Sequence, residues 1–439
     1  MRARGRQNAG MTGRAGRRAA GALALAVVAA LPACTTSKRA PAPTPSTPAP
    51  RATTTSALVP TDGLPAFYSV PSPLPQAPAG TLLKAEPVAL PALHGAMFRV
   101  MYTSTAASGA PVAVTGLVAV PATVSPAGGF PVVSWAHGTD GMAPQCAPSL
   151  DPGSGEGTLG IANLLLDRGW EMVATDYQGE GTPGPHPYLV GAVAAHDTID
   201  IVRAARSLPA AHASTTYAVW GHSEGGQTAM FALELGASYA PDLHLAGVVA
   251  GAPPSQFGLI YPFLRGTSGR YLLLMGVAGA HAAYGDARAP LDQLLTPLGL
   301  SLLPELTKGC EGDVANAVDR YTLDQLFKAD PATVPVWHDL IEANDPAAFT
   351  TPGPVPLLIP QGAADTTIPP VTTKVLTSHL CAIGQNVTRW LYPGFGHAGV
   401  VPAYIGDMEK WLAERFSGAP ATERVTPTGA QGVDVTTCP

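Results

Sequence analysis

The run of residues 217–227, Tyr-Ala-Val-Trp-Gly-His-Ser-Glu-Gly-Gly-Gln, constrains the fold of this chain more than any other stretch. Its first four residues are apolar or aromatic, which is typical of a buried strand, and the residues after it favour a helix. Between them lies Gly-x-Ser-x-Gly. Gly221 and Gly225 lack the β-carbons that would obstruct a sharp strand-to-helix turn, and such a turn exposes the Ser223 hydroxyl at the carboxyl edge of a sheet. The run therefore predicts an α/β architecture that carries a nucleophilic serine.

From about residue 85, short apolar runs alternate with helical stretches, which predicts an α/β fold with a mostly parallel sheet. The predicted strands are residues 98–102, 115–120, 131–135, 171–175, 217–220, 245–249, 356–359 and 389–392. The predicted helices are residues 159–168, 193–208, 227–235, 371–382 and 403–416. Residues 256–349 break the alternation and show little sign of strands. We interpret them as an inserted, mainly helical cap; an ordinary packed helical subdomain is the alternative.

The charge of the chain is unevenly distributed. The formal net charge is −6, but the first 33 residues carry six arginines and no acid, so without them it is −12. Residues 34–61 add Lys38, Arg39 and Arg51 and again no acid, which leaves −15 for the remainder. An acidic folded body excludes nucleic acid as a partner, because it repels phosphate backbones.

The N-terminal segment is typical of an export signal. A basic start leads into residues 19–30, an apolar stretch of about a dozen residues, whereas spanning a bilayer needs roughly 20. Leu31-Pro32-Ala33-Cys34 resembles a bacterial lipobox, in which Cys34 would carry lipid; ordinary cleavage near Ala33 is the alternative. We predict a signal peptide over residues 1–33 and a Pro/Thr/Ser-rich tether and lead-in over residues 34–84. The protein is then exported, either as a cell-surface lipoprotein held at the membrane or as a free secreted protein.

A serine hydroxyl is a weak nucleophile and needs a base that a third group orients, in the order Ser, acid, His in this fold class. Residues 355–365 are an apolar strand that ends in a turn with Asp365, and residues 390–397 are a later strand that ends in a glycine-bracketed His397. Catalytic groups of open α/β sheets gather at strand ends. We therefore predict Ser223 as nucleophile, His397 as base and Asp365 as the orienting acid. Asp345 is the alternative acid.

An oxyanion hole should accompany this serine. The elbow aims the backbone amide of Glu224 at a developing oxyanion, and a second donor is expected from the loop after an early strand. Residues 132–141 fit, since a strand there leads into His-Gly-Thr-Asp-Gly, although the residues alone leave open which of them donates. The chemistry requires no cofactor, and the sequence shows no metal-ligand spacing.

Five cysteines occur in the chain: Cys34, Cys146, Cys310, Cys381 and Cys438. If Cys34 carries lipid, the other four suffice for two disulfides in an oxidising compartment. Unpaired buried cysteines are the alternative.

Taken together, these segments resemble the secretory lipases, a family of triacylglycerol lipases, from about residue 85 to the C-terminus. The matching pieces are residues 137–139, 146–149, 175–177, 181–184, 186–188, 221–226, 238–243, 361–362 with Asp365, and 396–397. The resemblance implies an α/β-hydrolase core over residues 85–255 and 350–439 with the cap, residues 256–349, inserted between them. It also implies a catalytic triad of Ser223, Asp365 and His397, and an oxyanion hole formed by Asp140 and Glu224.

The same resemblance implies disulfides Cys146–Cys310 and Cys381–Cys438, whereas the lipobox and the tether depart from the family pattern. The function to expect is that of an exported serine carboxylic-ester hydrolase, a lipase that acts on acylglycerols through an acyl-serine intermediate. The alternatives are a short-chain carboxylesterase, a serine peptidase of the same fold and a non-catalytic surface-binding lipoprotein. The apolar cap residues 272–274 and 294–303 either contact an acyl chain or only pack the cap.

Overall fold

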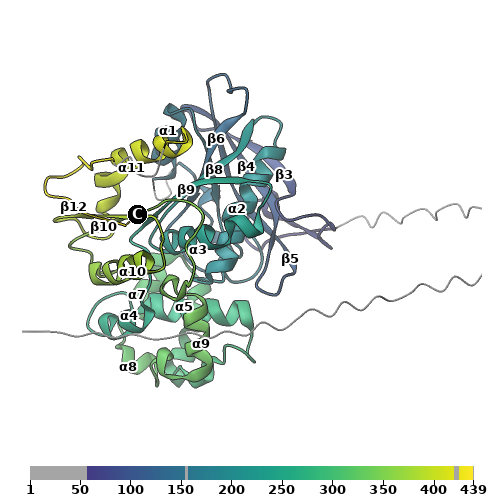
Figure 1. Cartoon of the computed structure of the whole chain (residues 1–439). Helices are drawn as coiled ribbons and strands as arrows, with labels where there is room; N and C mark the ends of the chain where they lie inside the picture. Colours follow the sequence, from purple (N-terminus) through teal and green to yellow (C-terminus); the bar gives the residue numbers. More distant parts are fainter. Residues whose placement is uncertain (1–56, 154–156, 420–424, 439) are drawn as a thin grey trace, which may run out of the picture. The chain divides into compact units, whose positions relative to one another are not determined.

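The computed structural model describes residues 57–153, 157–419 and 425–438 (Figure 1). The predicted signal peptide, the lipobox with Cys34 and the proline-rich start of the tether lie outside the described residues. Among the described residues, no helix combines the length and the apolar character needed to cross a membrane.

A ten-stranded sheet forms the centre of the described chain, in the order β12-β11-β10-β9-β8-β6-β7-β5-β4-β3. Its strands are β3 (Leu82–Val88), β4 (Gly95–Thr105), β5 (Pro111–Pro121), β6 (Phe130–Ala136), β7 (Glu171–Thr175), β8 (Ala213–His222), β9 (His244–Gly251), β10 (Leu357–Gly362), β11 (Val387–Tyr392) and β12 (Asp434–Cys438). The six central strands pair in parallel, in the order β7, β6, β8, β9, β10 and β11. At one end of the sheet β5, β4 and β3 join antiparallel, and at the other end β12 joins antiparallel. This largely parallel sheet confirms the predicted fold class, and each of the eight predicted strands is present.

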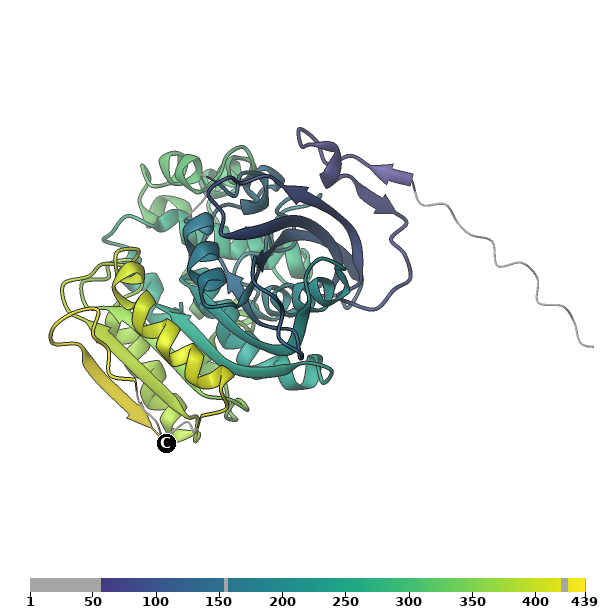
Figure 2. The ribbon, with the colours of Figure 1, turned by 90° about the horizontal axis from the view of Figure 1, so that it is seen from above.

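Helices cover both faces of the sheet. On one face lie α2 (Gly191–Ser207), α3 (Glu224–Tyr239) and α10 (Pro370–Ala382), and on the other lie α1 (Thr158–Asp167) and α11 (Val400–Phe416). Figure 2 shows α11, in yellow, lying over the strands at the end of the sheet that carries β12. Because both faces are covered, every residue of β7 and of β10 is buried, and these strands need apolar side chains on both sides.

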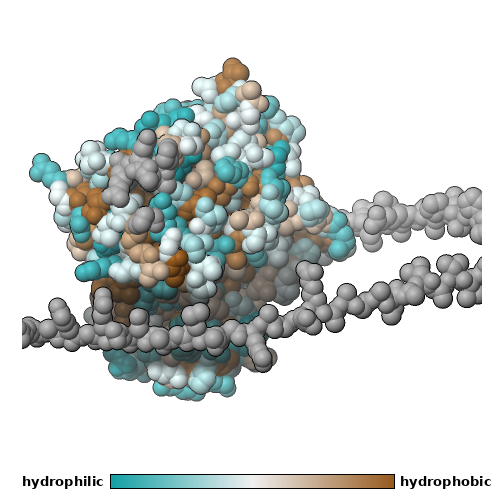
Figure 3. Space-filling model, in the orientation of Figure 1, coloured by the Kyte–Doolittle hydropathy of each residue, from teal (hydrophilic) through white to brown (hydrophobic). Residues whose placement is uncertain are grey.

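Residues 256–349 lie between β9 and β10 and contain helices and loops but no strand of either sheet; we call this segment the cap. Its helices are α4 (Phe257–Leu264), α5 (Arg270–Tyr284), α6 (Pro297–Leu302), α7 (Glu311–Val318), α8 (Leu323–Leu326) and α9 (Pro335–Ala343). They surround an apolar cluster of their own, which includes Leu274, Leu294 and Trp337, and they form the lower part of the molecule in Figure 1. On the face drawn in Figure 3, apolar residues form separate patches among polar ones.

Four strands were not anticipated from the sequence. The edge strands β3 and β12 are mostly half-buried or exposed, so neither shows the continuous apolar run of a central strand. The small sheet of β1 (Ala57–Val59) and β2 (Val70–Ser72) has strands of three residues. Part of the segment assigned to the tether and lead-in is therefore folded, and the central sheet begins at Leu82.

Glu171, at the start of β7, is an unusual residue for a central strand. It is fully buried, and neither of its carboxylate oxygens has a hydrogen-bond partner among the described residues. Burial raises the pKa of this carboxyl to about 8, so the folded protein keeps it neutral at pH 7. In the unfolded chain the group titrates near its ordinary value of 4.5. The unfolded state therefore loses this proton first as the pH rises, and stability falls between the two values.

We expect Glu171→Gln to remove this pH dependence. Relative to the variant, the free energy of unfolding of the natural protein should fall by up to about 1.4 kcal/mol per pH unit as the pH rises from 4.5 to 8. Urea denaturation at several pH values across this window measures the difference. The exposed Glu342→Gln serves as the control and should leave the slope unchanged. Parallel stability curves for Glu171→Gln and the natural protein would contradict the assignment.

Candidate active site

Ser223 lies on a sharp turn between β8 and α3. Its backbone has φ 60° and ψ −121°, a strained conformation for a residue with a side chain. The turn is possible because its two glycines leave no room for a side chain. A β-carbon on Gly221 would lie 2.1 Å from the carbonyl oxygen of Gly225, and one on Gly225 would lie 1.9 Å from that of Ala136. The predicted strand–turn–helix arrangement around Ser223 is present.

The structure brings Ser223, His397 and Asp365 together from three strand ends. The Nε2 atom of His397 lies 2.8 Å from the Ser223 Oγ, and its Nδ1 atom lies 2.7 Å from Asp365 Oδ2. Asp365 follows β10 and His397 follows β11, so parallel neighbouring strands deliver both groups to the same edge of the sheet. The result is a continuous hydrogen-bonded chain from a buried carboxylate to a serine hydroxyl.

Asp365 is held by its own turn. Its Oδ1 atom accepts hydrogen bonds from the amides of Thr367 and Ile368, each at 2.9 Å. Its Oδ2 atom accepts a bond of 2.9 Å from the side-chain amide of Gln361, besides facing His397. These donors fix the carboxylate toward the imidazole. Gln361 was not assigned a role of its own from the sequence, although a polar side chain at the end of an otherwise apolar strand is a signal that could have identified it.

Asp345, the alternative acid, is placed elsewhere. Its carboxylate accepts hydrogen bonds from the amides of Gln256, Phe257 and Ala347, at 2.8–3.0 Å. It therefore joins the two ends of the cap and caps a short helical turn. The carboxylate beside His397 is therefore that of Asp365 and not that of Asp345.

His222, next to the serine, was not singled out from the sequence. Its ring is buried and lies 4.9 Å from the ring of His397, centroid to centroid. Burial, helped by the nearby His397, lowers the pKa of His222 to about 3, so this imidazole stays neutral. A neutral ring adds no positive charge beside His397.

The two predicted oxyanion-hole residues lie at the start of α3 and in the loop after β6. Glu224 is the first residue of α3, where a backbone N–H has no acceptor within its own helix. Asp140 lies in the loop after β6, and this loop is attached to the cap. The Asp140 carbonyl accepts a bond of 2.7 Å from the Glu311 amide, and the disulfide Cys146–Cys310 joins the same two segments. Both disulfides implied by the resemblance are present, the second being Cys381–Cys438.

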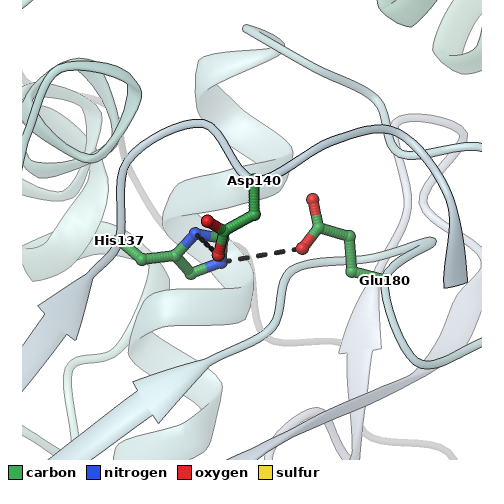
Figure 4. Close-up of side chains that lie close together, drawn as sticks. All are labelled: His137, Asp140 and Glu180. Atoms are coloured by element: carbon green, nitrogen blue, oxygen red, sulfur yellow. Dashed lines mark ion pairs between the residues drawn. The ribbon is translucent and has the colours of Figure 1, made fainter. Parts of the chain in front are cut away.

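Three residues around this loop are the candidate metal ligands in the described part of the chain: His137, Asp140 and Glu180 (Figure 4). The His137 Nδ1 atom lies 3.3 Å from Asp140 and 2.6 Å from the Gly138 carbonyl oxygen, while Nε2 lies 4.0 Å from Glu180. The two carboxylates thus approach opposite nitrogens of one ring. This arrangement places an imidazole between two carboxylates, and one ligand atom from each of the three residues lies within 4.8 Å of the other two.

A cavity of about 130 Å³ opens at Ser223. Its walls are mainly apolar side chains of the cap: Phe257, Ile260, Leu264, Leu272, Leu273, Val277, Trp337 and Leu340. An apolar cavity of about 150 Å³ binds benzene in another protein, so this cavity is slightly smaller than one that holds a small apolar molecule. Of the two leucine-rich stretches considered from the sequence, residues 272–273 contribute to the wall. Leu294, Leu295 and Leu302 pack into the apolar cluster of the cap instead.

Known proteins resemble this chain in sequence and in fold. A protein of Mycobacterium tuberculosis named "Probable inactive lipase" is 28% identical over 389 residues, which cover 83% of this chain and 84% of that protein. The secreted triacylglycerol lipase LIP3 of Malassezia globosa is 25% identical and covers 66% of each chain. The closed-state crystal structure of Candida antarctica lipase A superimposes with a TM-score of 0.69 at 22% identity, over 81% of this chain and 86% of that one. This likeness confirms the expected α/β-hydrolase fold.

The sequence pattern named "Secretory lipase" matches residues 157–424, a range that contains Ser223, Asp365 and His397. The match was expected from the motifs, and it spans more than half of the chain. The protein therefore belongs to the secretory lipase family of ester hydrolases.

Proposed function

We propose that this protein is an active serine hydrolase that cleaves carboxylic esters with apolar acyl groups, acylglycerols among them, through an acyl-serine intermediate. One observation carries the proposal: the hydrogen-bonded chain from Asp365 through His397 to Ser223 ends at the opening of an apolar cavity. A nucleophile with its base and orienting acid stands where an acyl chain would enter. That combination suits ester hydrolysis better than binding alone.

The hydrogen bonds of the triad support one proton path for the proposed reaction. His397 Nε2 removes the Ser223 hydroxyl proton while the serine oxygen attacks the ester carbonyl carbon. The protonated imidazole then gives that proton to the leaving alkoxide, and the acyl group stays on Ser223. In the second half of the reaction, His397 takes a proton from water while the water oxygen attacks the acyl carbon. His397 then returns that proton to the Ser223 oxygen as the acyl–oxygen bond breaks, which releases the acid and restores the serine. Asp365, bonded to Nδ1, keeps the ring in the required tautomer and stabilises its cation.

The carbonyl oxygen becomes negatively charged during both attacks. In this proposal the backbone amides of Glu224 and Asp140 donate hydrogen bonds to it. Each such donor is commonly worth about 10²–10³ in rate. The Glu224 amide is supported by its position directly after the nucleophile, and that of Asp140 by the placement of its loop beside the elbow.

A short-chain carboxylesterase of the same fold is the second candidate, because the triad alone does not set chain length. The apolar lining and the size of the cavity favour acyl groups longer than acetyl. A silent, surface-binding protein is the third candidate, since one relative carries the name of an inactive lipase. The hydrogen-bonded triad of this chain argues against a silent protein.

Fluorophosphonate labelling tests the nucleophile directly. We expect a covalent adduct on Ser223 in the natural protein. Asp365→Asn should slow both labelling and p-nitrophenyl ester hydrolysis by about 10³–10⁴-fold, because the imidazole loses its tautomer control. Peptide mapping of the adduct and kcat/KM for the ester measure the two effects. An unlabelled Ser223 in folded protein would contradict the proposed function.

Asp345→Asn is the matched control, since it makes the same change at the alternative acid. It should lower the free energy of unfolding by about 1 kcal/mol, because amides of the cap lose a charged acceptor. Its kcat/KM should stay within about three-fold of the natural value. Equal kinetic losses in the two variants would contradict the assignment of Asp365.

Gly276 offers a test of the cavity as an acyl site. It lies on α5 and lines the cavity, and a β-carbon there would lie 3.8 Å from Leu189, so a side chain fits. Gly276→Phe should fill part of the space and lower hydrolysis of p-nitrophenyl palmitate, relative to the acetate, by about ten-fold or more. Ala282→Phe, exposed on the same helix, is the control. An unchanged chain-length ratio, or no natural activity beyond butyrate, would favour the short-chain carboxylesterase.

We also propose that Cys34 is lipidated and that the tether holds the enzyme at the cell surface. The support is the lipobox-like sequence and the five prolines within residues 41–50. Cys34→Ser should then move the protein from the membrane fraction to the soluble fraction. The intact mass of the membrane-extracted natural protein should show a diacylglyceryl group on Cys34. An unmodified mature N-terminus would establish free secretion.

A further inference from the structure

The residue after the nucleophile carries a buried carboxyl group, which is negatively charged when ionised. The Glu224 side chain is buried, and its Oε1 atom lies 2.7 Å from the Nε2 atom of His186, which is also buried. The proposed reaction builds another negative charge at the carbonyl oxygen that the Glu224 amide would bind. Two negative charges close together in a site of low dielectric repel each other strongly. The Glu224 carboxylate therefore has to be neutralised if its amide is to stabilise an oxyanion.

His186 is in a position to neutralise it. Its Nδ1 atom lies 3.0 Å from the carbonyl oxygen of Gln178, and its Nε2 atom faces Glu224. When Glu224 is ionised, both partners are acceptors, and the ring satisfies them by donating from both nitrogens, which makes it an imidazolium. Burial lowers the pKa of His186, but the charge and hydrogen bond of Glu224, with smaller contributions from Gln178 and Asp197, outweigh it and raise the pKa.

The segment that carries His186, residues 177–188, also contacts the Asp140 loop on the other side of the proposed oxyanion hole. The backbone amide of His186 donates to the Met142 carbonyl at 3.2 Å. Tyr188, two residues on, places its hydroxyl 2.9 Å from the Thr139 hydroxyl, next to Asp140. Tyr177, on whose ring His186 stacks at an interplanar angle of 14°, donates its hydroxyl to the His137 carbonyl at 3.1 Å. Residues 177–188 thus contact both segments that would supply the two amides.

We propose that His186 is a positioning residue for the oxyanion hole: its imidazolium cancels the buried Glu224 carboxylate and fixes the Glu224 amide relative to the Asp140 loop. This inference rests on the proposed function. His186 does not touch the substrate in this proposal and acts through Glu224. Its removal should therefore affect the rate of the chemical step more than substrate binding.

The test separates charge compensation from packing. His186→Gln leaves an uncompensated carboxylate and should lower kcat by about ten-fold or more, with KM within about three-fold. The double variant with Glu224→Gln carries a neutral pair at these positions and should recover most of the lost kcat. His196→Gln is the matched control: His196 also stacks on a tyrosine, Tyr239, and its kcat should stay unchanged.

A second comparison leaves His186 in place, in case its variant does not fold. Glu224→Asp keeps the charge on a side chain too short to reach His186, whereas Glu224→Gln keeps the length without the charge. The proposal requires the aspartate variant to lose more kcat than the glutamine variant. The reverse order, or a double variant no better than His186→Gln, would reduce the pair to a packing role and overturn the proposal.

The charge of the ring can be measured without any activity. Histidine-selective ¹⁵N NMR of the natural protein should show both nitrogens of His186 protonated at neutral pH, with the signal assigned by its loss in His186→Gln. A neutral ring would overturn the inference even in an active enzyme. Absence of a Ser223 adduct beside a charged His186 would instead contradict the proposed function and leave the pair established. The two failures are therefore distinguishable.

Discussion

The close approach of three backbone segments at the elbow determines the geometry of the whole site. Gly221 packs against Gly225, and Gly225 packs against the carbonyl oxygens of Ala136 and His137. The first contact bends β8 into α3 and raises Ser223 above the sheet edge. The second brings the start of the Asp140 loop against the same helix. The absence of two β-carbons thus sets both the position of the nucleophile and the distance between the two expected oxyanion donors.

The central part of the fold was predictable because burial on two faces leaves a strong signal. Strands such as β7 and β10 are buried at every residue. In helices such as α1 and α10, the buried residues recur at helical spacing. The edges gave no such signal. β12 has three exposed residues out of five, and it is held by its antiparallel pairing with β11 and by the Cys381–Cys438 bond. Both of these depend on contacts far apart in the chain, which local patterns do not reveal.

Some residues of the candidate site were likewise predictable from the sequence, and others were not. Ser223, Asp365, His397 and the Asp140 loop each follow an apolar strand, so the order of the strands was enough to bring them to one edge. The loop residues that contact the site from outside these strand ends were not identified from the sequence. His186 lies in a turn-rich segment whose local sequence predicts no structure, and its contact with Glu224 joins residues 38 apart. Only the motif resemblance singled out that segment, and it gave the histidine no role.

The cap has two roles that constrain each other. It supplies most of the cavity wall, and its Cys310–Glu311 segment holds the Asp140 loop through a disulfide and a backbone hydrogen bond. Moving the cap as one body would therefore displace an expected oxyanion donor. A movement that admits substrate without that loss has to occur in the cap helices away from Cys310, and α4 and α5 are the ones that line the cavity. The disulfide and the hydrogen bond thus attach the Cys310–Glu311 segment to the Asp140 loop, whereas the cavity is lined by α4 and α5, which lie outside that segment.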